Sequence, residues 1–140
     1  MTRDEIVAFF TRRQLSVDQR DANALAAFHA DDSIVESLMA GTVTGREAIA
    51  NVYQAWFKAF PDVLMTMDDL IVDGNRAVVV NSVIGTDTGG FMGLPPTGRP
   101  FRLTIIHLYV MSDGLIQHER RIYDFTGLLV QIGVLKARPA

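Results

Sequence analysis

Hydrophobic side chains recur every three or four positions in two segments of the first half of the chain, a spacing that is typical of amphipathic helices. The first predicted helix covers residues 3–19, and Thr2 and Glu5 are spaced to form a capping box at its start. The second covers residues 46–60 and ends before Pro61, which cannot continue a helix. The recurring positions are Ile6, Phe9, Phe10, Arg13 and Val17 in the first helix, and Ile49, Val52, Tyr53, Trp56, Phe57 and Phe60 in the second.

Shorter elements connect these helices, and extended chain follows them. An alanine-rich turn or short helix is expected at residues 24–29 and a short strand at 33–38. Segments 63–72, 76–86, 101–111 and 115–123 are predicted strands, and Asp73 with Gly74 and Asn75 is a strong hairpin signal between the first two. Asp124 opens a last short helix over 125–132, which ends before Gly133. Helices followed by an antiparallel meander of four strands predict an α+β fold.

The composition narrows the possible functions. A chain of 140 residues with 49% hydrophobic content is long enough for one domain with its own core, which we expect over residues 1–140. The net charge of -3 gives no excess of basic residues that could bind nucleic acid. No segment reaches the roughly twenty apolar residues of a membrane span. The absence of cysteine excludes disulfides and thiolate chemistry. We therefore expect a cytoplasmic protein without nucleic-acid or membrane partners.

Polar side chains occupy both faces of the last predicted strand. Strict alternation places Ile116, His118, Arg120, Ile122 and Asp124 on one face, and Gln117, Glu119, Arg121 and Tyr123 on the other. Polar groups on both faces indicate that one face lines a cavity or a partner surface. In the preceding strand, His107 lies within a mostly apolar face. Such a histidine is either a core group with one satisfied hydrogen bond or a functional side chain.

Three blocks of the chain carry a family resemblance: GREAIANVYQAWFKAFPD, GGFMGLPPTGRPF and RIYDFTGLLVQIGVL. In content, order and spacing they resemble the signature blocks of the SnoaL-like polyketide cyclase family, and the resemblance extends over roughly residues 5–135. It implies the NTF2-like cone, in which a bent antiparallel sheet wraps around helices and leaves a deep apolar pocket. That fold hosts several reactions, so the function depends on the residues of the pocket.

The resemblance also implies a mechanism. In these cyclases an aspartate after the last strand acts as general acid and base in an intramolecular aldol closure, without metal or organic cofactor, and Asp124 matches it. An apolar pocket raises the basicity of such a carboxylate. Asp124 is equally suited to cap the last helix. His107 is expected to donate a hydrogen bond or relay a proton. The expected pocket walls are Tyr53, Trp56, Phe57, Phe91 and Met92.

Arg120 departs from the family pattern, since many members carry Glu-His-Trp where this chain has His118-Glu119-Arg120. If the strand bends, Arg120 reaches Asp124, lowers the pKa of its carboxyl group and weakens it as a base. Otherwise Arg120 is a solvated or structurally paired arginine. Glu36 lies on the short strand at 33–38 and faces either the rim of the pocket or solvent.

The connection GGFMGLPPTGR is unusually hydrophobic for a loop. Its glycines allow turns and its two prolines stiffen it, so we expect a lid whose Phe91, Met92 and Leu94 face inward over the pocket. The alternative is a loop that packs against the N-terminal helix.

The expected function is acid–base chemistry, without cofactor or metal, on a hydrophobic, carbonyl-bearing or polycyclic substrate. Aldol cyclisation is favoured, in a homodimer formed through the outer sheet face. One alternative is proton transfer as in ketosteroid isomerase, with Tyr53, Tyr109 or His107 as the donor to the enolate oxygen. Epoxide hydrolysis is disfavoured because the chain has no Arg-x-Asp sequence. A further alternative is a small-molecule-binding protein without turnover.

Overall fold

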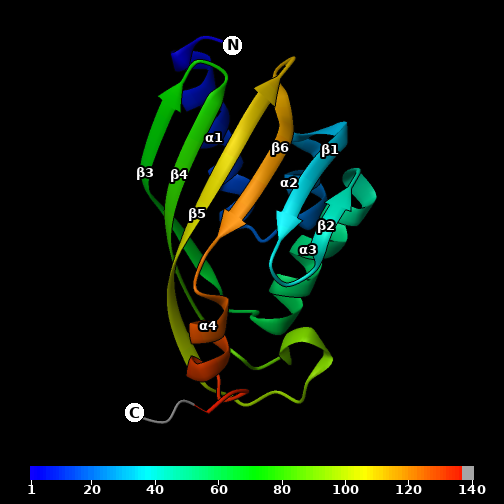
Figure 1. Ribbon diagram of the computed structural model, residues 1–140, viewed down its shortest axis with the longest axis vertical. Helices are drawn as coiled ribbons and strands as arrows, with labels where there is room; N and C mark the ends of the chain where they lie inside the picture. Colours follow the sequence, from blue (N-terminus) through cyan, green and yellow to red (C-terminus); the bar gives the residue numbers. More distant parts are fainter. Residues whose placement is uncertain (137–140) are drawn as a thin grey trace.

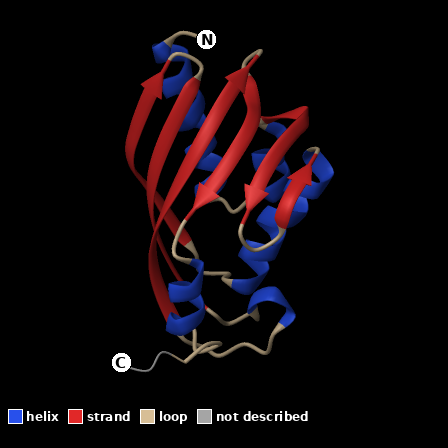
Figure 2. Ribbon diagram, viewed as in Figure 1, coloured by secondary structure: helices blue, strands red, loops and turns tan. Residues whose placement is uncertain are grey.

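Three helices pack on one face of a six-stranded sheet, and a fourth helix packs near the start of the fifth strand (Figures 1 and 2). The computed structural model describes residues 1–136. The helices are α1 (Arg3–Asp18), α2 (Ala22–Ala27), α3 (Arg46–Ala59) and α4 (Phe125–Gln131), with a 3-10 turn η1 (Phe91–Gly93) before the fifth strand. The expected helices over residues 3–19, 46–60 and 125–132 are confirmed to within one residue at each end.

The helix starts follow capping signals in the sequence. The Thr2 hydroxyl accepts a hydrogen bond from the Glu5 backbone N–H at 3.1 Å at the start of α1. Asp21 caps α2 through the Ala24 N–H, so this helix begins two residues before the expected segment 24–29. Within residues 1–136, no helix is long and apolar enough to cross a membrane.

The strands are β1 (His29–Ser37), β2 (Gly41–Thr44), β3 (Leu64–Asp73), β4 (Arg76–Thr86), β5 (Pro100–Ser112) and β6 (Leu115–Ile122), in the sheet order β2-β1-β6-β5-β4-β3. The expected antiparallel meander is confirmed as β3 to β6, with a two-residue turn at Gly74 and Asn75. Two features of the sheet were not expected. β1 pairs in parallel with β6, and β2 adds an edge strand beside β1.

A bulge in β6 changes the phase of its side chains. Val110 pairs with His118, while the next residue of β5, Met111, pairs with Ile116, so Gln117 is an extra residue in β6. A bulge of this kind places two residues opposite one and reverses the alternation beyond it. The expected grouping of Ile116 with His118 on one face is therefore wrong.

Beyond the bulge, Glu119 and Arg121 point toward the helices and are buried, while Arg120 lies on the outer face. Glu119 pairs across the sheet with Tyr109, and Arg121 pairs with His107. The same strand pair thus places two charged side chains directly beside two polar side chains in the interior.

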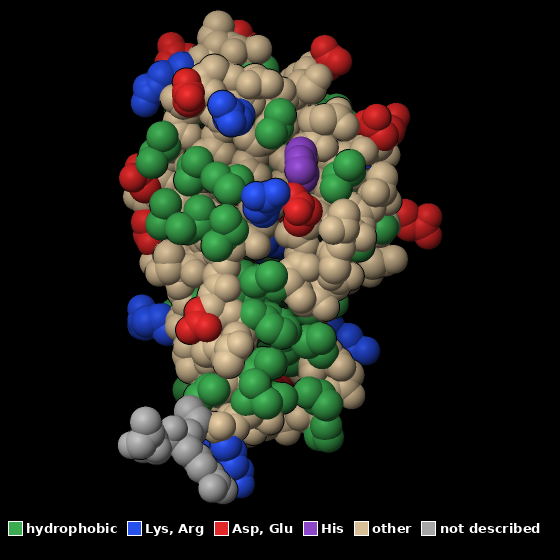
Figure 3. Space-filling model, in the orientation of Figure 1, with side chains coloured by type: hydrophobic (Ala, Val, Ile, Leu, Met, Phe, Trp, Pro, Cys, Tyr) green, Lys and Arg blue, Asp and Glu red, His purple; other side chains and the backbone are tan. Residues whose placement is uncertain are grey.

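The outer face of the sheet carries exposed hydrophobic side chains among charged ones, as the space-filling view shows (Figure 3). Ile34, Ile71 and Ile122 are 38%, 53% and 45% exposed. The expected homodimer through this face stays a prediction.

The hydrophobic connection between β4 and β5 is held by a buried carboxylate. Asp87 accepts hydrogen bonds from the Gly90 N–H at 3.1 Å, the Thr97 N–H at 3.1 Å and the Thr97 hydroxyl at 3.0 Å. The Gly89 N–H donates to the Ala59 carbonyl at the end of α3. These contacts join both ends of the connection to the body of the protein, so it is an anchored loop.

Only one of the three large side chains of this loop faces inward. Phe91 is fully buried and stacks on Phe60 at 5.2 Å between ring centroids, with Trp56 at 5.6 Å. Met92 and Leu94 are 52% and 43% exposed. The expectation that all three face inward is therefore corrected, because the turn at η1 inserts one aromatic ring into the core and directs the other two side chains outward. The loop packs on α3 rather than on the N-terminal helix.

Candidate active site

A small internal cavity lies between the helices and the inner face of the sheet. Its open volume is about 40 Å³, which is small for a site that binds an organic ligand. The lining residues are Arg13, Val17, Leu25, Tyr53, Trp56, Phe57, Val63, Met65, Ile105, His107, Arg121 and Tyr123.

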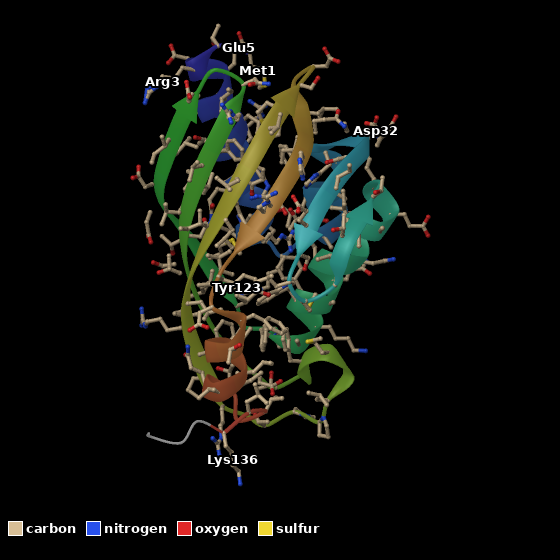
Figure 4. The ribbon with its side chains drawn as sticks, in the orientation of Figure 1. Met1, Arg3, Glu5, Asp32, Tyr123 and Lys136 are labelled. Atoms are coloured by element: carbon tan, nitrogen blue, oxygen red, sulfur yellow. The ribbon has the colours of Figure 1, made fainter. Side chains whose placement is uncertain are left out.

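The polar side chains of this lining come from four parts of the chain. Arg13 occupies a core position on α1, Tyr53 lies on the buried side of α3, and His107 and Arg121 lie opposite each other on β5 and β6. Tyr123 follows the end of β6, in the link to α4 (Figure 4). Elements that are distant in sequence therefore place two guanidinium groups, a histidine and two phenols around one cavity.

A hydrogen-bonded network joins the charged groups. Arg13 Nη2 donates to the Tyr53 hydroxyl at 2.7 Å, and Arg121 Nε donates to Glu119 Oε2 at 2.6 Å. The Tyr53 hydroxyl lies 3.5 Å from Glu119 Oε1 and so links the two pairs weakly. The Arg121 guanidinium also lies over the Tyr53 ring, 4.9 Å from its centroid.

Glu119 and Arg121 are both ionised. Burial alone raises the pKa of Glu119, but the surrounding positive charge, chiefly that of Arg121, more than offsets this effect, and its pKa lies well below the usual range. Burial alone lowers the pKa of Arg121, and the Glu119 carboxylate reverses that effect. Because Glu119 is held as a carboxylate by Arg121, it is a weak base.

His107 is neutral, and its Nδ1 faces two polar groups. Its Nδ1 lies 3.2 Å from Asn81 Nδ2 and 3.1 Å from the Tyr109 hydroxyl. The Asn81 amide nitrogen can only donate, so Nδ1 accepts and the neutral ring carries its proton on Nε2. Burial lowers the pKa of His107 to about 3. The expected role of His107 as a donor is consistent with this protonation state.

A second buried histidine, His29, lies next to the Tyr53 hydroxyl of this network. Its Nδ1 lies 3.1 Å from the Ser33 hydroxyl, and its Nε2 lies 3.4 Å from the Tyr53 hydroxyl. Burial lowers the pKa of His29 to about 4. The ring is therefore neutral at neutral pH, and it does not belong to the cavity lining.

Four buried polar atoms have no hydrogen-bond partner within the described residues: Arg13 Nε, Trp56 Nε1, Arg121 Nη2 and the Tyr123 hydroxyl. All four belong to residues of this cavity lining. Buried polar groups are normally paired, because an unpaired one retains a desolvation cost of about 1–3 kcal/mol. The unpartnered donors therefore gather on side chains around one cavity.

Several of the expected site residues meet at this cavity. Tyr53, Trp56, Phe57 and His107 line it. Tyr109 does not line the cavity, but its hydroxyl contacts His107 Nδ1, which does belong to a lining residue. Phe91 is absent from the lining and packs behind Trp56. The structure thus brings together the aromatic walls and the histidine that the sequence indicated.

The other expected site residues lie elsewhere. Asp124 is exposed and its Oδ1 accepts from the Gly127 N–H at 2.8 Å, which makes it the N-cap of α4. Arg120 Nε donates to Glu36 Oε2 at 3.1 Å, on the outer face of the sheet. Of the two alternatives for Arg120, the structure therefore shows the paired arginine and not the approach to Asp124, because the bulge directs Arg120 outward.

Glu36 is a surface carboxylate in this arrangement. Its Oε2 also lies 2.7 Å from His118 Nε2. The hydrogen bond from Arg120, and then that from His118, lowers the pKa of Glu36. Glu36 therefore faces solvent, the second of its two expected orientations.

The sequence contained signals for some of the site residues that it did not identify. Arg13 occupies a recurring position of the first helix that is otherwise hydrophobic, and a charge at such a position indicates a buried, paired arginine. Glu119 and Arg121 alternate with outward positions at the end of β6, but the bulge hid their orientation. His29 precedes the expected strand and gave no signal.

Comparisons with known proteins agree with this fold. The family model described as SnoaL-like polyketide cyclase matches residues 8–132. The nogalonic acid methyl ester cyclase of Streptomyces nogalater is 28% identical over 130 residues, covering 91% of each chain. The structure of TsrD from Streptomyces laurentii matches with a TM-score of 0.84 and 24% identity, covering 96% of this chain and 99% of that chain.

An NTF2-like protein from Burkholderia pseudomallei matches with a TM-score of 0.77 and 16% identity, covering 94% of this chain and 98% of that chain. The expected NTF2-like fold is therefore confirmed. Among the described residues there is no group of three His, Asp or Glu side chains placed to hold a metal ion.

Proposed function

The chain belongs to the SnoaL-like polyketide cyclase family, and from this premise we propose that it closes a ring in a hydrophobic, carbonyl-bearing substrate by an intramolecular aldol reaction. The reaction takes place in the cavity lined by Trp56, His107 and Arg121. The cyclase activity named for the Streptomyces nogalater relative supports the choice of reaction.

The observation that carries this proposal is the set of unpartnered donors on one cavity: Arg13 Nε, Trp56 Nε1, Arg121 Nη2 and the Tyr123 hydroxyl. In an aldol closure the α-carbon loses a proton, and the resulting enolate carbon bonds to the carbon of a second carbonyl group. The oxygen of that carbonyl becomes an alkoxide and takes up a proton. Two stages of the reaction therefore carry a negative oxygen, and fixed donors in a buried site lower the free energy of both.

Tyr123 is suited to act as one of these donors. Burial raises the pKa of its hydroxyl to about 12, against the opposing effect of Arg121, so the phenol keeps its proton at neutral pH. Its hydroxyl is buried and bonds no other group among residues 1–136. A substrate oxygen that reaches this hydroxyl gains a hydrogen bond at no cost to the network.

Asp124 was expected to take the α-proton, and its position changes the proposal. It caps α4 and does not line the cavity. The buried carboxylate, Glu119, is held by Arg121 and is a weak base. The proposal therefore assigns catalysis to stabilisation of the anionic stages, and the α-proton passes to solvent water.

The test compares Tyr123→Phe with Asp124→Asn on a panel of aromatic methyl esters that carry an acidic methylene group between two carbonyls. Tyr123→Phe removes only the unpartnered hydroxyl, so kcat should fall by roughly 100-fold or more while the melting temperature stays equal or rises. Asp124→Asn keeps a good N-cap, so turnover should remain close to that of the wild type.

Two results would overturn this assignment. Full turnover by Tyr123→Phe would remove the cavity donor from the mechanism. Loss of turnover in a folded Asp124→Asn variant would return the role of base to Asp124. If the wild type binds the esters but closes no ring, the protein is a small-molecule-binding protein and the proposed reaction is wrong.

A further inference from the structure

The cavity carries an excess of buried positive charge. Arg13 and Arg121 are 5% and 7% exposed, and Glu119 is fully buried. Two guanidinium groups therefore face one carboxylate. Within residues 1–136 one further carboxylate, Asp87, is fully buried, but its hydrogen bonds are local to the β4–β5 connection and it is absent from the cavity lining.

The neighbouring titratable groups do not remove this excess. His29 and His107 are neutral, since burial lowers their pKa values. The phenols of Tyr109 and Tyr123 keep their protons, because burial raises their pKa values. Arg46 is half-exposed and pairs with Asp31 at 2.5 Å. The network around Arg13, Arg121 and Glu119 is thus left with one uncompensated positive charge.

Each of the two arginines that line the cavity has one N–H group without a hydrogen-bond partner among residues 1–136. Arg13 uses Nη2 for Tyr53 and leaves Nε unpartnered, while Arg121 uses Nε for Glu119 and leaves Nη2 unpartnered. Water could accept from these groups, but it would not neutralise the charge. A buried charge without a counter-charge is costly, so an anionic oxygen is the favoured acceptor here.

Apart from Tyr53, His107 and Tyr123, the rest of the lining is hydrophobic. It consists of aliphatic and thioether side chains together with two aromatic walls: Val17, Leu25, Val63, Met65, Ile105, Trp56 and Phe57. A small inorganic anion would make no contact with most of these hydrophobic side chains. The lining therefore fits a molecule with an apolar body and one ionised oxygen.

We infer that the substrate occupies this cavity as a hydrophobic monoanion, whose ionised oxygen accepts hydrogen bonds from Arg13 Nε and Arg121 Nη2. The inference rests on the proposed function and gives the charge state of its substrate. A compound with an acidic methylene between two carbonyls releases one proton to solvent and binds as its enolate. The first proton transfer of the aldol reaction is then complete on binding, which explains why no strong base lines the cavity.

An aromatic ligand needs more space than the open volume of about 40 Å³. Met65 and Phe57 are partly buried lining residues that retain contact with solvent. The Met65 side chain is unbranched and changes rotamer at low cost. We expect ligand binding to displace these two side chains while the charged network stays in place.

The binding assay uses the fluorescence of Trp56, because the chain has one tryptophan and it lines the cavity. Two pairs of probes separate charge from shape at neutral pH: 2-hydroxy-1,4-naphthoquinone against 1,4-naphthoquinone, and 2-naphthoate against 2-naphthamide. The first acid ionises to an enolate and the second to a carboxylate. Each anion should bind at least roughly tenfold more tightly than its neutral partner, as expected for charge-assisted hydrogen bonds. The relative affinity of the two anions identifies the preferred oxygen group.

Three variants test the source of the preference. Arg13→Met removes the excess charge, so the preference for the anion should fall roughly tenfold. Glu119→Gln adds one unit of net positive charge and should increase the preference. Arg12→Met is the matched control, because Arg12 is the exposed neighbour of Arg13 on α1 and should leave the preference unchanged. If Arg13→Met does not fold, Glu119→Gln still tests the charge in the opposite direction.

Equal binding of the anion and its neutral partner would overturn the inference, as would an unchanged preference in both cavity variants. The outcome is separate from that of the proposed reaction. If anions are preferred but no ester is cyclised, the anion site stands and the cyclase proposal falls. If esters whose methylene is activated by only one carbonyl, and which are therefore not ionised at neutral pH, are cyclised equally well, the cyclase proposal stands and the anion inference falls.

Discussion

Two buried neutral histidines should make the fold sensitive to mild acid. His29 and His107 have pKa values of about 4 and about 3 in the folded protein, with burial as the main cause. An unfolded histidine has a pKa of about 6.5. Below that value the unfolded chain binds protons that the folded chain does not, so the free energy of unfolding falls as the pH falls. The stability is present above about pH 6.5 and is lost progressively toward the folded pKa values.

The size of the effect follows from the two pKa differences. Each histidine that stays neutral in the folded state costs about 1.4 kcal/mol of stability per pH unit below about pH 6.5. Between about pH 7.5 and about pH 5 this amounts to about 2 kcal/mol for each histidine and about 4 kcal/mol for the pair. A typical domain has only about 5–15 kcal/mol in total, so the loss is a large fraction of its stability.

Urea unfolding at the two pH values, followed by Trp56 fluorescence, measures this loss. His29→Gln and His107→Gln each remove one titrating group, so each single variant should lose only about 2 kcal/mol over the same pH range. The double variant should show little pH dependence there. The low pKa of Glu119 affects stability only below about pH 4.3, outside the measured range, because there the unfolded chain binds a proton at this glutamate and the folded chain does not.

The reasoning is refuted if the wild type has the same free energy of unfolding at both pH values. It is also refuted if the double variant retains the full pH dependence, since the titrating groups would then lie elsewhere.

Two further predictions concern the β4–β5 connection. Phe91→Ala should reduce the free energy of unfolding by about 3–5 kcal/mol, because the ring is fully buried. The control Met92→Ser should change it by less than about 0.5 kcal/mol. Similar losses for the two variants in urea unfolding would show that the loop does not anchor through Phe91. Asp87→Ala leaves three donors, from Gly90 and Thr97, without their acceptor and should lower the free energy of unfolding by at least about 3 kcal/mol. Amide hydrogen exchange should also become faster in this loop. Unchanged exchange would contradict the role of Asp87 as the anchor.

The elements that the sequence predicted are those fixed by local physics. Residues 3–19 and 46–60 carry a helical repeat with their own start and stop signals, and the turn at Gly74 and Asn75 needs only its own residues. The three blocks that resemble the family predicted the fold, because three segments in the correct order identify a fold better than any one of them does. The parallel pairing of β1 with β6 was not predicted, because partners more than 80 residues apart leave no local pattern.

The site was only partly predictable for the same reason. Aromatic residues at helical spacing, Trp56 and Phe57 among them, reach the cavity as expected. The expectations for Asp124 and Arg120 came from the family pattern and from strict alternation along the last strand. The structure departs from strict alternation because β6 contains one extra residue, Gln117. A bulge depends on how a strand fits its neighbours, so alternation along one strand cannot reveal it.

The sequence by itself determined the helices, the meander, the family and a net charge of -3 for the whole chain. Only the tertiary structure decided which charges are buried together. Folding leaves most carboxylates in water and brings Arg13 and Arg121 to one carboxylate, Glu119, in the interior. An acidic protein thus encloses a positively charged cavity, because the local field depends on the few charges that burial removes from solvent and not on the sum over the chain.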